Sequence, residues 1–98
     1  MNIVAVTACP TGIAHTYMAA EQLENAAKAL GHKIKVETQG AMGVENELSA
    51  ADIAAAGGII FAVDISVEQR ERFDGRKILE VPVQEAIKNP GGVIARLG

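Results

Sequence analysis

The residue best suited to chemistry is Cys9, the single cysteine of the chain. It lies in the segment TACPTGIAHT (residues 7–16), which follows the apolar run of residues 2–6 and precedes a long alanine-rich stretch. A strand, a turn with proline and glycine, and then a helix would direct the N–H groups of the first helical turn toward the sulfur. Such N–H groups stabilise a thiolate and bind phosphate oxygens. We therefore predict that Cys9 is an ionised, reactive thiol placed to hold a phosphoryl group.

The residues after Cys9 supply the groups expected around a bound phosphoryl group. Gly12 allows close approach of the backbone, and Thr11 and Thr16 offer hydroxyl donors. Pro10 has no N–H group and is expected to shape the turn. His15 could either donate to the anion or cap the first helical turn. The predicted phosphate cradle comprises Pro10, Thr11, Gly12, Ile13, Ala14, His15 and Thr16.

A buried, unreactive side chain is the commoner role of a lone cysteine in a small protein. Core cysteines lie within strands or on the apolar stripe of a helix, however, whereas Cys9 follows a strand and occupies a turn. This position favours a functional thiol.

The composition limits the other roles of the chain. With 98 residues and 49% apolar side chains, it supports one compact domain, whose core must be aliphatic because aromatic residues make up only 3%. The net charge of −3 argues against nucleic-acid binding. A single cysteine forms no internal disulfide, and no apolar run approaches the roughly 20 residues that span a bilayer. We expect a cytosolic protein that meets a membrane only through a partner.

The apolar patterns predict alternating strands and helices. Strands are expected at residues 2–7, 33–38, 58–63 and 76–81, and helices at 14–30, 49–56, 66–73, 83–88 and 93–97. Residues 39–46 are expected to form a loop, and residues 90–92 to separate the last two helices. This alternation predicts a parallel sheet. Ligands of such sheets bind at the carboxyl ends of the strands, where Cys9 lies.

Some local signals refine these elements. The first helix is expected to bury a stripe that includes Leu23 and Leu30, and to end before Gly31. Residues 33–38 alternate strictly, as in an edge strand with one solvated face. Two pairs of residues resemble capping boxes at the starts of short helices, namely Ser49 with Asp52 and Ser66 with Gln69.

Low-molecular-weight tyrosine phosphatases also carry a cysteine loop after the first strand of a parallel sheet. Their motif places an arginine six residues after the cysteine, where this chain has His15. Without that guanidinium the loop should accept a phosphoryl group but transfer it poorly to water. A phosphoryl carrier is therefore favoured over a Cys-dependent phosphatase. A regulatory interaction module that uses the same surface is the third hypothesis.

The segment VTACPTGIAHTYMAAE (residues 6–21) resembles the signature of fructose-type IIB domains of the bacterial phosphoenolpyruvate-dependent sugar phosphotransferase system. The similarity covers essentially the whole chain. It continues in Glu37-Thr38-Gln39-Gly40, Gly43 and Asn46, in Ala62-Val63-Asp64, and in Arg72-Phe73.

The resemblance implies that residues 1–98 form a single IIB domain of the α/β class, a four-stranded parallel sheet flanked by helices on both faces. It implies that Cys9 accepts a phosphoryl group from a phosphohistidine of a IIA protein or domain. The phosphocysteine would pass the group to a sugar, by family default fructose, bound by the membrane IIC permease on its cytoplasmic side. The activity implied is that of a protein-phosphohistidine–sugar phosphotransferase. No nucleotide, metal or organic cofactor is expected.

Two side chains at the start of the first helix extend the predicted site. Tyr17 and Met18 lie off the apolar stripe of this helix and next to the cysteine loop. Exposed apolar side chains beside a reactive group are plausible docking contacts for the partners, and scattered surface apolarity is the alternative.

Overall fold

The computed structural model describes residues 1–9, 13–40 and 43–97, with residue 13 by its backbone alone. Its elements are, in chain order, β1 (Asn2–Ala8), α1 (Ile13–Ala29), β2 (Lys33–Gly40), β3 (Gly43–Glu45), α2 (Ala50–Ala55), β4 (Gly58–Val63), the 3₁₀ turn η1 (Arg70–Phe73), β5 (Leu79–Val81), α3 (Val83–Lys88) and α4 (Pro90–Ala95).

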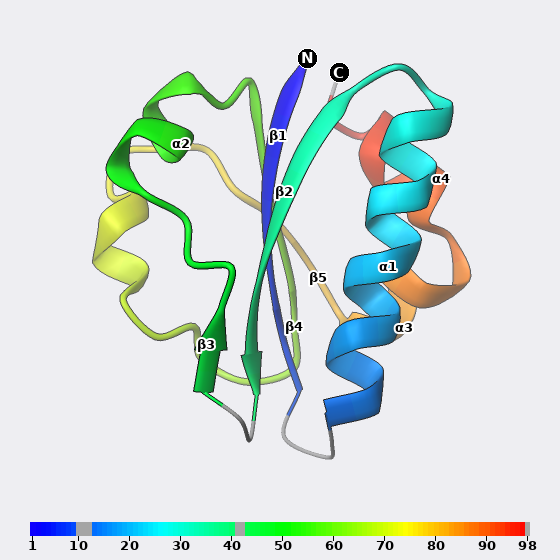
Figure 1. Ribbon diagram of the computed structural model, residues 1–98, viewed down its shortest axis with the longest axis horizontal. Helices are drawn as coiled ribbons and strands as arrows, with labels where there is room; N and C mark the ends of the chain where they lie inside the picture. Colours follow the sequence, from blue (N-terminus) through cyan, green and yellow to red (C-terminus); the bar gives the residue numbers. More distant parts are fainter. Residues whose placement is uncertain (10–12, 41–42, 98) are drawn as a thin grey trace.

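The sheet has the strand order β3-β2-β1-β4-β5, with β1 at its centre (Figure 1). The pairs β1–β2, β1–β4 and β4–β5 are parallel, as predicted. The short strand β3 was expected to be part of a loop, but it pairs antiparallel with the end of β2. Three residues are too few to show an alternating pattern in the sequence. The pairing of Gly40 with Gly43 is therefore visible only in the structure. The sheet is therefore five-stranded and mixed rather than four-stranded and parallel.

Helices cover both faces of the sheet, as predicted. α1, α3 and α4 lie on one face, and α2 and η1 on the other (Figure 1). Alternate residues of β1 point to opposite faces: Ile3 and Ala5 pack with Leu23 of α1, whereas Val4 and Val6 belong to the second core cluster. These two cores hold β1 rigidly, and Cys9 follows directly after it.

The first helix buries the expected stripe, and Leu23 is fully enclosed. Gly31 follows with a φ of 82°, the left-handed conformation of a helix C-terminal glycine. Leu30 departs from the prediction, because the helix ends at Ala29 and the Leu30 side chain is 54% exposed. Leu30 is therefore not part of the buried apolar stripe of α1.

The second half of the chain contains the remaining differences. The capping box of Ser49 and Asp52 is present. A helix was predicted at residues 66–73, but only the turn η1 forms there. Gln69, which precedes η1, has a left-handed backbone conformation. The predicted strand at 76–81 is shortened to β5. Pro90 begins α4 instead of separating two helices, because a proline suits the first helical turn and the Asn89 side chain accepts from Gly92 N–H at 3.3 Å.

Candidate functional site

Cys9 directly follows β1 at the carboxyl end of this strand, and β1 runs from the N-terminus at the top of Figure 1 toward the bottom. Ala8 of β1 is in register with Val63 of β4, and Asp64 N–H donates to Ala8 O at 3.0 Å. One residue beyond this register, Cys9 and Asp64 are therefore neighbours whose side chains project to the same face. The Cys9 thiol donates to Asp64 Oδ2 with a sulfur–oxygen distance of 3.8 Å.

Two more residues lie beside Cys9 and Asp64 at this end of the sheet, namely Gly40 and Val83. Ala8 is also in register with Gln39 of β2, so Gly40 follows on the other flank of Cys9. On the far side, Val83 N–H at the start of α3 donates to Asp64 Oδ1 at 3.3 Å. The Cys9 residue is 6% exposed. The thiol thus has a carboxylate on one side and a residue without a side chain on the other.

The predicted cradle is described only in part. Pro10, Thr11 and Gly12 lie outside the described residues. Ile13 opens α1, so the expected order of strand, connecting segment and helix is present. Ala14 and His15 are exposed, whereas Thr16 is buried. Whether these residues hold a phosphoryl group stays a prediction.

The Thr16 hydroxyl and the Thr38 hydroxyl form a polar feature that the sequence did not indicate. Both residues are buried, and neither Oγ1 atom has a hydrogen-bond partner within the described residues. Thr16 O accepts from Thr7 Oγ1 at 3.2 Å, and a Cβ atom at Gly40 would lie 4.0 Å from Thr16 Oγ1. The space beside Gly40 is therefore lined by a buried hydroxyl group.

A buried ion pair supports the same edge of the sheet. Glu37 of β2 is 0% exposed. Its carboxylate accepts from both terminal nitrogens of Arg72, from Leu48 N–H at 2.8 Å and from Gln39 Nε2 at 2.6 Å. Burial by itself disfavours the charged carboxylate, but these hydrogen bonds outweigh it and hold the pKa of Glu37 below its usual value. The hydrogen bonds that Arg72 donates to Glu37 raise the pKa of Arg72.

Gln39 extends this hydrogen-bond network from Glu37 to the backbone of Glu68. Its side chain accepts from Glu68 N–H at 2.8 Å and donates to Glu68 O at 3.1 Å. The end of β2 is thereby joined to the segment that follows Asp64. The alternating pattern of residues 33–38 placed Glu37 on a solvated face. The structure corrects this prediction, because Glu37 is buried and its carboxylate is bound by Arg72 and by Leu48 N–H. The signal was present in the family motif, which includes Glu37, Gln39 and Arg72.

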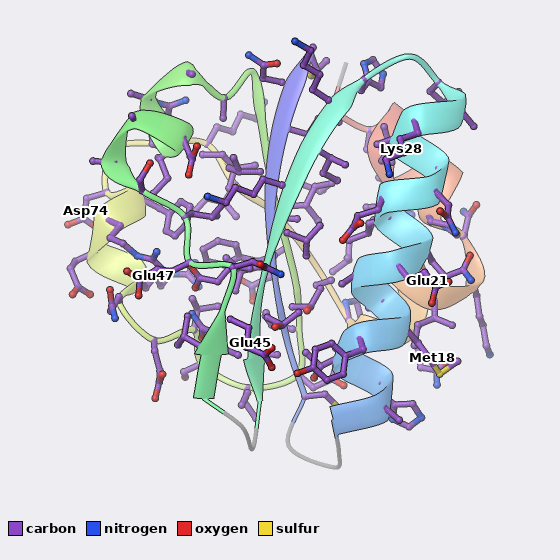
Figure 2. The ribbon with its side chains drawn as sticks, in the orientation of Figure 1. Met18, Glu21, Lys28, Glu45, Glu47 and Asp74 are labelled. Atoms are coloured by element: carbon purple, nitrogen blue, oxygen red, sulfur yellow. The ribbon has the colours of Figure 1, made fainter. Side chains whose placement is uncertain are left out.

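Exposed apolar side chains surround the site, as the sequence predicted for two of them. Tyr17 and Met18 of α1 and Ile65 after β4 are exposed. The Tyr17 hydroxyl donates to Glu45 Oε1 of β3, and this bond raises the pKa of Tyr17. In Figure 2, Glu45 faces the first turns of α1, whereas Met18 points outward.

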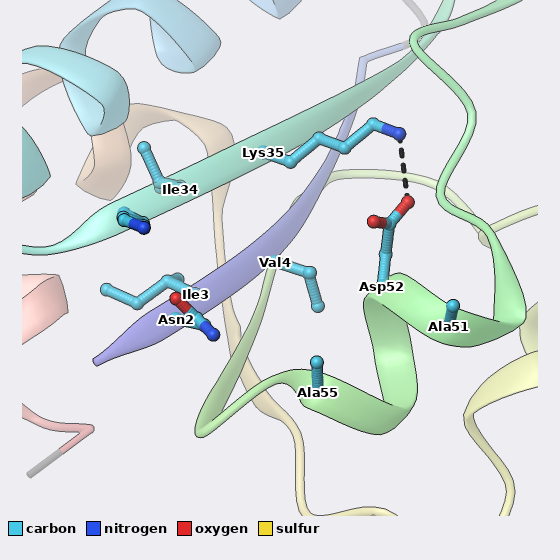
Figure 3. A pocket seen from close by; sticks show the side chains of 9 residues that line it. Asn2, Ile3, Val4, Ile34, Lys35, Ala51, Asp52 and Ala55 are labelled. Atoms are coloured by element: carbon cyan, nitrogen blue, oxygen red, sulfur yellow. Dashed lines mark hydrogen bonds and ion pairs between the residues drawn. The ribbon is translucent and has the colours of Figure 1, made fainter.

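Two hollows lie at opposite ends of the sheet. A cleft of about 400 Å³ lies beside Asp64 and is lined by Val63, Asp64, Ile65, Ser66, Arg70 and Glu80. A second hollow of about 270 Å³ lies at the opposite end, between β1, β2 and α2, where Lys35 and Asp52 form an ion pair (Figure 3). The first cleft includes Asp64, which accepts a hydrogen bond from the Cys9 thiol, and the second includes no residue in contact with that thiol among those described. None of the helices in the described ranges is both long and apolar enough to cross a membrane.

Comparisons with known proteins agree with this geometry. The family model described as the lactose/cellobiose-specific IIB subunit of the phosphotransferase system matches residues 4–96. The fructose-like EIIB component 2 of Escherichia coli is 52% identical over 98% of this chain and 91% of its own length. The E. coli fructose-like EIIBC component is 52% identical over 99% of this chain, which covers 20% of that longer protein.

A solved domain of the fructose-specific IIABC component from Borrelia burgdorferi superimposes with a TM-score of 0.93. It is 46% identical, and the match covers 98% of this chain and 91% of that domain. Full-length matches at this level, in sequence and in structure, show common ancestry. The chain belongs to the IIB family of the sugar phosphotransferase system and is of the fructose type.

Proposed function

We propose that Cys9 is the phosphoryl carrier of a fructose-type sugar uptake system. The sulfur attacks the phosphohistidine of a IIA protein, so that the S–P bond forms, the N–P bond breaks and the thiol proton passes to the released imidazole. A hydroxyl group of a sugar held by a membrane IIC protein then attacks the phosphocysteine. The O–P bond forms, the S–P bond breaks, and the hydroxyl proton returns to the sulfur.

The observation that carries the proposal is the position of Cys9. It follows the central strand at the carboxyl edge and is succeeded, after three residues, by the 17-residue helix α1. The first N–H groups of such a helix are free to bind an anion. A phosphoryl transfer enzyme needs mainly this kind of positioning and charge stabilisation. The predicted cradle, residues 10–16, belongs to the same proposal.

The partners are inferred from the relatives. The E. coli EIIBC component carries a segment like this chain within a longer polypeptide whose name joins B and C components, and the B. burgdorferi domain comes from a component named IIABC. Both names support a IIC acceptor for this chain, and the second also supports a IIA donor. The IIC partner would bring the protein to the inner face of the membrane.

The identity of the sugar is proposed from the same comparisons. The family model is described as lactose/cellobiose-specific, whereas relatives at about half identity are named fructose-like. Because the individual relatives match nearly the whole chain at this identity, we favour a fructose-like sugar.

Hydrolytic activity is less well supported. The position that holds arginine in the phosphatase motif is occupied by His15, whose side chain is exposed. Arg72 is already bound to both oxygens of Glu37. The phosphocysteine should therefore survive until an acceptor arrives.

The experiment is to mix the protein with a phosphorylated fructose-type IIA protein and to locate the transferred group by mass spectrometry. We expect one stable phosphoryl group on Cys9, no label on Cys9→Ser, and normal labelling of the control His32→Gln, which changes a histidine in contact with the N-terminal amino group. Release of free phosphate would favour a phosphatase, and absence of any label on the wild-type protein would favour an interaction module. Label retained by Cys9→Ser would assign the acceptor to another residue.

A further inference from the structure

Asp64 is a charged side chain that accepts a hydrogen bond from the Cys9 thiol. In the sequence it belonged to the family motif but had no predicted chemical role. Its two carboxylate oxygens have different partners: Oδ2 accepts from the thiol, and Oδ1 accepts from Val83 N–H. The second bond fixes the carboxylate against the start of α3, so its place beside the sulfur is determined by the backbone of two elements.

The charge of Asp64 is not neutralised by the neighbouring arginines. Among the described residues, Arg70 forms its ion pair with Glu80 at 3.2 Å, and Arg72 forms its ion pair with Glu37 at 2.8 Å. Arg70 lines the same cleft as Asp64, but its ion-pair partner is Glu80. No salt bridge within the described ranges includes Asp64, so its carboxylate presents a negative charge to the sulfur.

A negative charge beside the sulfur disfavours both the thiolate and the phosphorylated form of a cysteine. A carboxylate that accepts a hydrogen bond from a thiol stabilises S–H relative to the thiolate. A phosphorylated sulfur carries additional negative charge, which a carboxylate a few ångströms away repels. Asp64 is exposed, so solvent weakens the effect without abolishing it.

We propose that Asp64 is a positioning residue that holds the Cys9 thiol through its hydrogen bond and makes the phosphocysteine a better phosphoryl donor. The carboxylate forms no covalent bond and ends each cycle with the charge it started with. The thiol proton leaves with the imidazole of the donor and returns from the sugar hydroxyl, after which Asp64 again accepts the hydrogen bond. The part of this proposal that concerns the phosphocysteine depends on the proposed function, and the part that concerns the thiol does not.

The first experiment measures the alkylation rate of Cys9, which needs no partner protein. Asp64→Asn keeps the shape of the side chain and removes its charge. We expect neutral iodoacetamide to react roughly three- to tenfold faster with Asp64→Asn than with the wild-type protein. The matched control is Asp74→Asn, since Asp74 is an exposed carboxylate directly after η1, on the side of the molecule away from α1 (Figure 2). It should react at the wild-type rate.

A loosened fold would also expose the thiol, so the experiment needs a readout that follows charge. Iodoacetate is an anion of nearly the same size as iodoacetamide. Removing a carboxylate should accelerate the alkylation of Cys9 by iodoacetate more than its alkylation by iodoacetamide. Local unfolding would accelerate both reactions equally. Asp64→Glu, which restores the charge, should return both rates toward wild type. An unchanged or lower rate in Asp64→Asn, or equal acceleration of the two reagents, would overturn the proposal.

The second experiment measures how the phosphoryl group distributes between the IIA protein and this protein at equilibrium. We expect Asp64→Asn to shift the distribution toward phosphocysteine by roughly three- to tenfold, and Asp74→Asn to leave it unchanged. A distribution that does not move in Asp64→Asn contradicts the second half of the proposal. If the wild-type protein takes no label at all, the proposed carrier function fails, while the alkylation result still decides the role of Asp64 toward the thiol.

Discussion

The guanidinium of Arg72 donates to both carboxylate oxygens of Glu37, at 2.8 and 2.9 Å, and to Leu48 O at 3.0 Å. These contacts join β2 to η1 beneath the edge of the sheet that carries Cys9. A buried pair of this kind is costly to break, because the remaining charge loses its partner in a place that water reaches poorly.

We expect Glu37→Gln to lower the free energy of unfolding by about 2–4 kcal/mol at neutral pH, less than a fully buried pair would lose because Arg72 is partly exposed. The pKa of Glu37 is lowered in the folded protein, so its ionised form contributes stability that is complete above the unfolded value, about 4.3. This contribution is lost as the pH falls through the lower folded value. Urea denaturation should therefore show the difference between wild type and variant shrinking in acid.

The control for this prediction is Glu80→Gln. Glu80 forms an exposed ion pair with Arg70, and such pairs contribute less than about 1 kcal/mol. If Glu37→Gln costs no more than Glu80→Gln, the buried network is not a source of stability.

The hydroxyls of Thr16 and Thr38, which have no partner within the described ranges, predict an unusual response to substitution. Thr38→Val removes a buried hydroxyl that has no partner among the described residues, so we expect the stability to stay the same or rise by up to about 1 kcal/mol. Thr7→Val removes a buried hydroxyl that donates to Thr16 O and should cost about 1 kcal/mol. Thermal unfolding of both variants tests the contrast, and equal losses would mean that the Thr38 hydroxyl is bonded after all.

Tyr17 is the only tyrosine of the chain, so its ionisation can be followed by ultraviolet absorbance alone. Its hydroxyl donates to the Glu45 carboxylate, and this raises the pKa of Tyr17. We expect titration above the usual tyrosine value of about 10. Glu45→Gln should bring the midpoint back toward that value, whereas Glu47→Gln should leave it unchanged. Identical midpoints in the wild-type protein and Glu45→Gln would show that the bond between α1 and β3 is absent in solution.

Leu23 and Leu30 form a matched pair for substitution, because Leu23 lies within α1 and Leu30 directly follows it. Leu23 is fully buried against the sheet, whereas Leu30 lies after the end of α1 and is exposed. Leu23→Ala should lower the free energy of unfolding by about 2–5 kcal/mol, and Leu30→Ala by less than about 0.5 kcal/mol. Similar losses in the two variants would argue that Leu30 packs in the core as the sequence suggested.

Local signals explain where the sequence predictions succeed. The apolar runs of β1 and β4 and the stripe of α1 are long, so their periodicity identifies them. The capping box at Ser49 depends on contacts three residues apart and is therefore readable from sequence. Short elements such as β3 and η1 lack a repeating pattern, and their conformation depends on what packs against them.

The candidate site divides in the same way. The sequence determined that Cys9 ends the first strand and precedes a helix, because that order follows from neighbouring residues, and the family motif around it identified the kind of protein. Only the tertiary structure decided that Asp64 lies against the thiol and that Glu37 and Arg72 are buried together. Those contacts join segments 55 and 35 residues apart, and strand register and layer packing, rather than local periodicity, bring such segments into contact.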